Sequence, residues 1–258
     1  MAKKIDVQYS HDNQIVRIIL NSHKGNVLDA VMMDDIQNTL KELKDQLQVK
    51  LIQFTGEGEH FCFGASVPEH TKEKAPEMLK QFHALFYTLA DLAIPTAALV
   101  SGQCLGGGME LALMCNFMFL DQTARLGQPE ISLAVFAPPA SVILPMKIGQ
   151  ARADDLLLTG RIIKPDVALQ MGLATEVFDD RDAMMSGVDG WVEKYILPKS
   201  ASSLKFAVRA ARGQFNKTLK KRLDKLEELY IDELMDTNDA NEGINSFLER
   251  RKPEWKNE

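Results

Sequence analysis

The spacing of apolar residues switches repeatedly between two patterns along the first 180 residues. Short runs rich in Ile, Val, Leu and Phe predict strands at 14–20, 51–55, 96–100, 117–120 and 174–178. Apolar positions three and four apart predict intervening helices over 36–47, 78–89 and 109–115, the first of which Asp29 can cap. This alternation indicates an α/β fold with helices packed outside a sheet.

The pattern changes after Pro198, where strand signals stop. Amphipathic helices are predicted at 200–212, 219–235 and 241–251. We therefore expect two regions, an α/β core over residues 1–198 and a helical region over 199–258. A helical appendage with little core of its own commonly packs on another subunit.

Composition narrows the class of protein. The net charge of −6 over 258 residues argues against a dedicated nucleic-acid binder. No apolar run reaches the roughly 18 residues that a membrane helix needs, and no apolar signal core follows the N-terminus. The three cysteines lack metal-ligand spacing and are expected to be reduced thiols. A soluble, cytoplasmic protein without a metal site is predicted.

Two glutamates are the strongest catalytic candidates. Glu110 follows Gly106-Gly107-Gly108-Met109, and Glu130 ends Gly127-Gln128-Pro129-Glu130. Two positioned carboxyl groups can divide acid and base roles, as the addition or removal of water requires. Taken singly, the first could be a favourable charge near a helix end and the second a solvated loop residue. Their combination favours catalysis.

Two glycine-containing segments can present bare backbone N–H groups. Small residues leave the Ala65 N–H accessible after Gly64, and Gly107 lies where a helix is expected to begin. Two such donors aimed at one point form an oxyanion hole suited to an enolate. The glycine run fits neither a dinucleotide fingerprint nor a phosphate-binding loop, and tight helix–strand packing is the alternative explanation.

Together these motifs resemble the crotonase family, the enoyl-CoA hydratase/isomerase superfamily, over nearly the whole chain. The matching segments are Gly64-Ala65-Ser66, Gly106-Gly107-Gly108-Met109-Glu110, Gly127-Gln128-Pro129-Glu130, Leu158-Thr159-Gly160, and residues 168–173 and 243–252. The resemblance implies a crotonase-like spiral of β-β-α units and a C-terminal helical region that forms trimers. A homotrimer or a homohexamer built as a dimer of trimers is expected.

The same resemblance implies an acyl-CoA substrate, with CoA as part of the substrate and no separate cofactor. The thioester carbonyl would be held by the N–H groups of Ala65 and Gly107, and water between Glu110 and Glu130. Retention of both glutamates favours a hydratase. We expect Glu110 to activate water and Glu130 to donate a proton to carbon.

Two departures from the family pattern bear on the acyl group. Val135-Phe136-Ala137-Pro138-Pro139 replaces a glycine-rich stretch, and Ser66 replaces the usual Asp at the start of 66–70. Both segments resemble hydratases that act on cyclic dienoyl-CoA thioesters in anaerobic aromatic degradation. The residues expected to contact substrate are Gly64, Ser66, Val67, Pro68, Gly106, Phe136, Pro138, Phe247 and Arg250.

Other interpretations remain at this point. The substrate could be cyclohex-1-ene-1-carbonyl-CoA or an acyclic 2-enoyl-CoA. Some crotonase relatives bind RNA through a basic helix, and basic residues occur here at Lys217, Lys220, Lys221, Arg222 and Lys225. Intervening acidic residues favour a solvated or subunit-contact face. His70 is expected to be a solvated loop residue rather than part of the pocket, and His83 to be structural.

Overall fold

A computed structural model describes residues 3–23 and 25–258, and within them one large sheet has six strands in the order β1-β2-β3-β4-β6-β8. The strands are β1 (Ile5–Ser10), β2 (Ile15–Leu20), β3 (Leu51–Gly56), β4 (Thr96–Val100), β6 (Phe117–Asp121) and β8 (Glu176–Phe178). β1 and β2 are antiparallel, whereas all later pairs are parallel. The strands expected from the sequence are thus present, although β8 begins two residues later than predicted.

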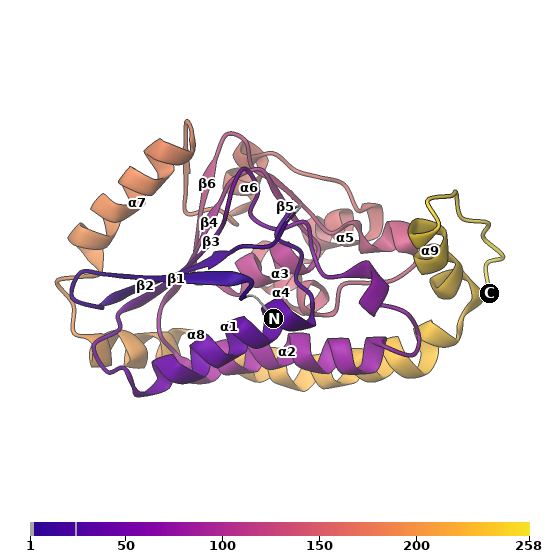
Figure 1. Ribbon diagram of the computed structural model, residues 1–258, viewed down its shortest axis with the longest axis horizontal. Coiled ribbons are helices and arrows are strands. Elements are labelled where there is room, and N and C mark those ends of the chain that lie inside the picture. The colour runs from indigo at the N-terminus through magenta and orange to yellow at the C-terminus, as the bar shows by residue number, and fades with distance from the viewer. Residues whose placement is uncertain (1–2, 24) are drawn as a thin grey trace.

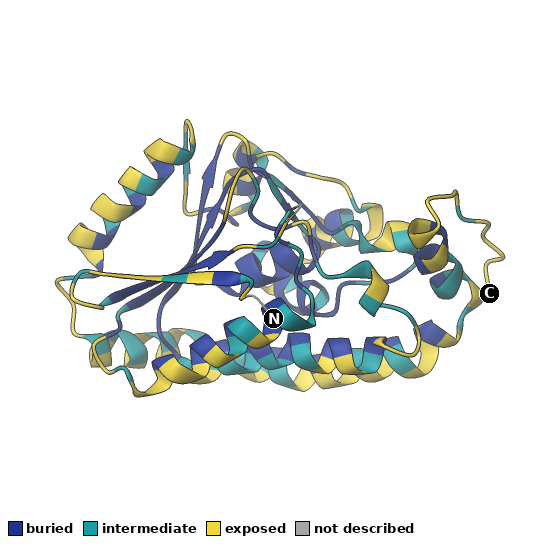
Figure 2. Ribbon diagram, in the orientation of Figure 1, coloured by how far each residue is buried: buried dark blue, intermediate teal, exposed yellow. Residues whose placement is uncertain are grey.

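Both faces of this sheet are covered, because alternate strand residues enter two separate hydrophobic clusters. α7 (Arg181–Tyr195) covers one face, where its Met184 and Val188 join Leu99 and Phe119. The larger core lies on the other face, beneath α1 (Ala30–Glu42), α2 (Ala75–Leu92), α3 (Gly107–Met114) and α4 (Pro138–Ile148). Figures 1 and 2 show α7 apart from the other helices and the buried strands between them.

A second, smaller sheet pairs β5 (Gln103–Leu105) with β7 (Arg125–Gly127) in parallel. Single bridges extend it, from Cys62 to Cys104 and from Leu126 to Ile163. The chain therefore passes repeatedly from a strand of the large sheet to a segment of the small sheet and then into a helix. β3 leads through Cys62 to α2, β4 through β5 to α3, and β6 through β7 to α4. This is the predicted spiral of β-β-α units.

The C-terminal region differs from the sequence prediction in one respect. The helix expected at 200–212 and the first part of the one expected at 219–235 form one continuous helix, α8 (Ala201–Glu228). The break expected between residues 212 and 219 was wrong, because Leu219 and Leu223 hold the helix in the main core, where it packs on α2 and α4. α8 runs along the base of the molecule beside α2 in Figure 1.

Short irregular turns connect α8 to the last helix. A π-helical turn over Leu229–Glu233 and a 3₁₀ turn over Leu234–Asp236 precede α9 (Asn238–Leu248). The remaining helices are α5 (Gln150–Thr159) and α6 (Pro165–Met171). Among the helices of residues 3–23 and 25–258, none is both long and apolar enough to cross a membrane.

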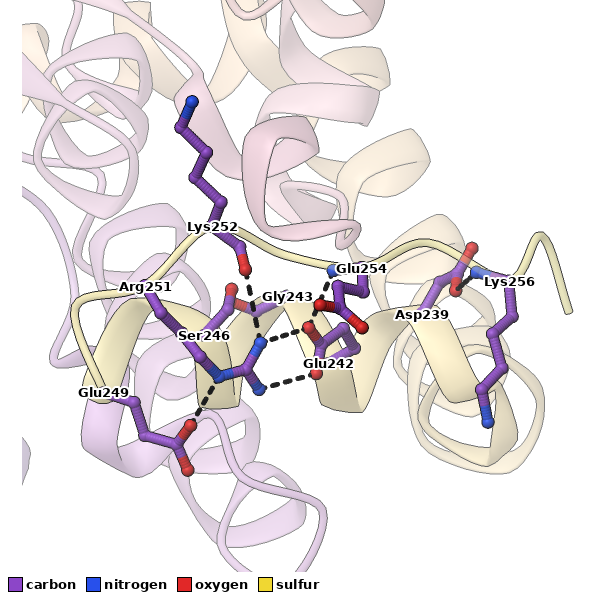
Figure 3. Close-up of polar contacts among 9 residues, drawn as sticks. All are labelled: Asp239, Glu242, Gly243, Ser246, Glu249, Arg251, Lys252, Glu254 and Lys256. Carbon is purple, nitrogen blue, oxygen red and sulfur yellow. Dashed lines mark hydrogen bonds and ion pairs between the residues drawn. The ribbon is translucent and has the colours of Figure 1, made fainter.

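The segment after α9 folds back along that helix (Figure 3). Arg251 forms ion pairs with Glu242 and, at 2.5 Å, with Glu249. The backbone N–H groups of Glu254 and Lys256 donate to Glu242 at 2.8 Å and to Asp239 at 2.7 Å. These contacts fix the outer side of α9, whose inner side packs on the 3₁₀ turn η3 (Pro129–Leu133).

Candidate active site

One cavity of about 540 Å³ gathers nearly all of the residues predicted to form the site. Those lining it are Gly64, Ala65, Ser66, Val67, Pro68, Gly106, Gly107, Glu110, Glu130, Phe136, Pro138 and Phe247. Arg250 does not line the cavity and is exposed just beyond α9, so its contact with substrate stays a prediction. The next residue, Arg251, pairs with glutamates on the outer side of α9.

The small sheet explains how the two glutamates come together. β5 and β7 run side by side, and the Gly106 N–H donates to the Gly127 carbonyl at 2.9 Å. α3 starts directly after β5 and bears Glu110 in its first turn, while η3 starts just after β7 and bears Glu130. Both carboxyl groups therefore enter the cavity from the same edge of one sheet.

Glu110 is almost completely buried, with 3% of its surface exposed. Its Oε1 accepts a hydrogen bond from the Ala140 N–H near the start of α4, at 2.9 Å. Burial raises the pKa of Glu110 well above its ordinary value, the charge of Glu130 raises it further, and the Ala140 hydrogen bond opposes both effects. Glu110 is thus suited to hold a proton at neutral pH.

Burial also raises the pKa of Glu130, to about 7. In the orientation that satisfies its hydrogen bonds, the buried Gln128 amide nitrogen donates to both Glu130 oxygens, at 3.1 and 3.0 Å. This contact favours the ionised form of Glu130. Because both pKa values are raised, the Glu110 and Glu130 pair can retain a proton at neutral pH, as an acid–base pair requires.

The backbone donors expected from the sequence lie close together. A parallel bridge between Leu28 and Ala65 uses the Gly64 carbonyl and the Ser66 N–H, which leaves the Ala65 N–H directed away from Leu28. Gly107 is the first residue of α3, so its N–H has no acceptor within the helix. A Cβ atom on Gly107 would lie 3.2 Å from the Ala65 nitrogen, so neither donor tolerates much bulk beside it.

Mostly apolar side chains from three helical segments close the cavity, with the phenol of one tyrosine among them. Met78, Leu79 and Phe82 come from α2, Phe247 from α9, and Tyr230 from the π-helical turn after α8. Sequence reasoning missed all but Phe247, since these positions show only the helical spacing of an ordinary core. The contribution of Tyr230, which lies far along the chain from both glutamates, becomes visible only in three dimensions.

The structure contradicts the position predicted for His70 and agrees with the structural role predicted for His83. His70 lines the cavity, contrary to the solvated position expected for it, and its Nδ1 lies 2.8 Å from the Ser66 carbonyl oxygen. Burial lowers the pKa of His70, so the neutral ring donates this hydrogen bond. His83 is fully buried, and its Nδ1 lies 2.7 Å from a Glu227 oxygen on α8. That contact joins α2 to α8, a structural role.

The cysteines are free and buried, and burial raises the pKa of Cys62 to about 12 and of Cys115 to about 11. None of the three therefore has the exposed, low-pKa thiol of a nucleophile. Within the described part of the chain, no three His, Cys, Asp or Glu side chains gather as a metal site would need.

Two proteins of similar sequence have names that include a hydratase activity. A protein 40% identical over 253 residues, 98% of this chain and 97% of the relative, is the cyclohexa-1,5-dienecarbonyl-CoA hydratase of Thauera aromatica. A Rhizobium meliloti protein named "Probable enoyl-CoA hydratase" is 34% identical over 90% of each chain.

Solved structures show the same fold. The crystal structure of an enoyl-CoA hydratase from Bacillus halodurans matches with a TM-score of 0.87 at 17% identity, covering 94% of this chain and 99% of that one. One from Mycobacterium avium subsp. paratuberculosis gives 0.86 at 21% identity, covering 98% and 99%. The family model for enoyl-CoA hydratase/isomerase matches residues 10–258. The chain belongs to the enoyl-CoA hydratase/isomerase family and has the crotonase fold.

Proposed function

We propose that this protein hydrates cyclohexa-1,5-diene-1-carbonyl-CoA to 6-hydroxycyclohex-1-ene-1-carbonyl-CoA. The observation that supports a hydratase most directly is the pair of carboxyl groups with raised pKa values, Glu110 and Glu130, in one cavity with Ala65 and Gly107. The ring substrate is supported by the 40% identity to the Thauera aromatica enzyme. Anaerobic degradation of benzoyl-CoA is the setting that this reaction fits.

The wall of the cavity also suits a flat ring. Phe136 packs edge-on against Tyr230, with ring centroids 5.3 Å apart. Pro138, the first residue of α4, lines the same cavity and has a fixed backbone φ. A rigid apolar wall matches a rigid substrate better than a flexible acyl chain, because less conformational freedom is lost on binding.

The reaction has two proton transfers. One carboxylate removes a proton from water as its oxygen attacks the β-carbon, and the electrons move onto the thioester oxygen, where the Ala65 and Gly107 N–H groups donate to it. The other carboxyl group then gives its proton to the remote carbon of the dienolate. The sum is a 1,4-addition of water that leaves one ring double bond in conjugation with the thioester.

The roles of water-activating base and proton donor to carbon can be assigned to the two glutamates in two ways. The sequence favoured Glu110 as the base and Glu130 as the proton donor. The fuller burial of Glu110 and the Gln128 contact to Glu130 favour the opposite assignment in the resting enzyme. Both assignments need one glutamate protonated and the other ionised, and they predict different hydrogen exchange in the Glu110→Gln and Glu130→Gln variants.

Assembly, cofactor use and location are part of the proposal. We propose a homotrimer or homohexamer that acts in the cytoplasm on an acyl-CoA substrate and needs no separate cofactor. Ser66, Val67, Pro68, Gly64 and Gly106 would line the acyl group. RNA binding is not favoured, since Lys220 pairs with Asp91 at 2.6 Å and Asp224 lies among the basic residues of α8.

Turnover of three thioesters tests the proposal. The purified protein is incubated with the cyclic dienoyl-CoA, cyclohex-1-ene-1-carbonyl-CoA and crotonyl-CoA, and addition of water is followed by mass. We expect the dienoyl-CoA to be hydrated with the highest kcat/KM, and the Glu130→Gln variant to show little product. A higher kcat/KM for crotonyl-CoA would contradict the ring substrate, and failure to hydrate any of them would contradict the hydratase.

A further inference from the structure

Tyr230 is a polar residue of the cavity for which the two-carboxyl mechanism has no role. Only 1% of its surface is exposed, and it lines the same cavity as Glu110 and Glu130. Its hydroxyl has no hydrogen-bond partner among the residues that the structure describes. A buried hydroxyl without a partner is costly, so a phenylalanine would be the better choice if only the ring were needed.

The Tyr230 ring packs against one aromatic neighbour and belongs to an irregular helical turn. Its edge-on contact with Phe136 has an interplanar angle of 66°. The residue belongs to the π-helical turn Leu229–Glu233, which follows the α-helical geometry of α8. Such turns often mark functional sites, because they redirect side chains relative to a regular helix. The structure therefore holds the phenol rigidly against the cavity.

The charges around the hydroxyl determine what it can do. Burial raises the pKa of Tyr230, and the charges of Glu130 and Glu110 raise it further. The phenol therefore stays protonated and can donate a hydrogen bond, whereas action as a base or nucleophile is disfavoured. Tyr230 lines the same cavity as both carboxyl groups, which is where they would act on substrate.

We propose that Tyr230 donates a hydrogen bond to the oxygen atom of the water that adds to the ring and to the hydroxyl group formed from it. This inference rests on the proposed hydratase function. The thioester oxygen already has the Ala65 and Gly107 donors, so the adding oxygen is the remaining acceptor that the reaction creates. No covalent bond to Tyr230 forms or breaks, since the proton lost by water goes to a glutamate and the phenol keeps its own.

The donor would act in both directions of the reaction. During hydration it orients a lone pair of the water away from the phenol and toward the ring. During dehydration it stabilises the departing oxygen. Tyr230 would also favour substrates that place the new hydroxyl group beside Phe136. The phenol would then supply a polar contact on an otherwise apolar side of the cavity.

The test is Tyr230→Phe, which removes the hydroxyl and keeps the ring contact with Phe136. We expect kcat for the cyclic dienoyl-CoA to fall about 10- to 100-fold while KM changes little, because the lost contact is made to water rather than to the thioester. Tyr87→Phe is the matched control. The Tyr87 hydroxyl donates to Asp224 at 2.7 Å, and the residue does not line the cavity, so kcat should be unaffected.

Ligand binding gives a second readout that a purely structural role would not produce. In an inactive Glu110→Gln background, Tyr230→Phe should weaken binding of 6-hydroxycyclohex-1-ene-1-carbonyl-CoA by about 5- to 50-fold. Binding of cyclohexane-1-carbonyl-CoA, which has no ring hydroxyl, should stay the same. Unchanged binding of both, or equal weakening of both, would overturn the role of Tyr230.

The two proposals can fail separately. If the wild-type protein does not hydrate the cyclic dienoyl-CoA, the same comparison is made with crotonyl-CoA and 3-hydroxybutyryl-CoA. Loss of kcat and of hydroxyacyl binding there would uphold Tyr230 while removing the ring substrate. Normal kcat in Tyr230→Phe with any hydrated substrate would overturn the inference whichever acyl group is used.

Discussion

The backbone of Gly106 lies directly against the carboxyl group of Glu130. A Cβ atom on Gly106 would come within 2.6 Å of Oε1, and the residue has a φ of 49°. Residues with side chains are strained in that conformation. The glycine run thus does more than expose N–H groups, because it also leaves room for one of the two acid–base residues.

Gly106→Ala should therefore impair catalysis more than folding. The methyl group would displace the Glu130 carboxyl group, and we expect kcat/KM to fall about 100-fold, since small misplacements of a reacting group are costly. The positive φ should lower the free energy of unfolding by about 1 kcal/mol. Steady-state rates and urea denaturation measure the two effects.

The control for this variant is Gly190→Ala in α7, where a Cβ atom would meet no neighbour within 4 Å. It should gain about 0.5–1 kcal/mol of stability with unchanged activity, because alanine is favoured over glycine inside a helix. Normal turnover in Gly106→Ala would show that Glu130 is not held where the structure places it.

Glu110→Gln and Glu130→Gln should each lower kcat by about 10²–10⁴-fold, the usual contribution of a general acid or base, while thioester binding is largely kept. Incubation of the hydroxylated product in D₂O then separates the two roles. The variant that retains the carbon-side glutamate should exchange the ring hydrogen that hydration delivers, without loss of water. Exchange in Glu110→Gln would assign Glu130 to carbon, and exchange in Glu130→Gln would assign Glu110. Near-wild-type rates in either variant would reject the pair.

The raised pKa of Glu130 predicts a pH-dependent effect on stability. With a folded-state pKa of about 7 against the ordinary 4.5, the folded protein binds this proton more tightly than the unfolded chain. Stability from this group is therefore full at low pH and falls as the pH rises from 4.5 through 7. Glutamine does not titrate, so the Glu130→Gln variant does not lose this stability. Its free energy of unfolding relative to wild type should therefore rise by up to about 3 kcal/mol between pH 4.5 and pH 8. Chemical denaturation of both proteins at pH 4.5 and pH 8 measures this change. The same difference in free energy of unfolding between variant and wild type at both pH values would contradict the raised pKa of Glu130.

Gly243 allows α9 to approach the turn that bears Glu130. A Cβ atom there would lie 2.1 Å from the Leu133 carbonyl oxygen, and backbone cannot move aside as a flexible side chain can. Gly243→Ala should cost about 1–3 kcal/mol of stability, as overpacking does, and should lower kcat because η3 shifts. Gly213→Ala on α8, with no neighbour within 4 Å, is the control. Equal stability of the two variants would show that α9 is not packed on η3.

The sequence correctly predicted the features that depend on residues close together along the chain. Asp29 caps α1 as predicted, accepting from the Met32 N–H at 3.1 Å, and the Ile- and Val-rich runs form strands. The motifs around the glutamates were found because glycines and carboxyl groups lie next to each other along the chain. The prediction of separate helices failed because packing between distant segments determines the length of α8. Gly213 costs a helix about 1 kcal/mol, and burial of Leu219 and Leu223 outweighs that cost.

The residues of the cavity wall also divide into those that local motifs predict and those that only packing places there. Ser66, Phe136 and Phe247 could be named because their segments resemble known motifs. Tyr230 and His70 could not be assigned to the cavity in advance, since one looks like a core aromatic of a helix and the other like a loop residue. Their positions depend on where α8 ends and how the 3₁₀ turn at Val67–Glu69 packs.

The pairing of β5 with β7 gives a physical meaning to the interval of twenty residues between the glutamates. The chain needs that length to leave the small sheet through α3, cross the large sheet in β6 and return as β7 beside its starting point. The interval is thus the length of one circuit of the spiral. Insertions at the turn before β7 would lengthen the loop without separating the glutamates, whereas a shift in the β5–β7 register would move one carboxyl group past the other. The catalytic distance is set by strand alignment rather than by the number of residues in between.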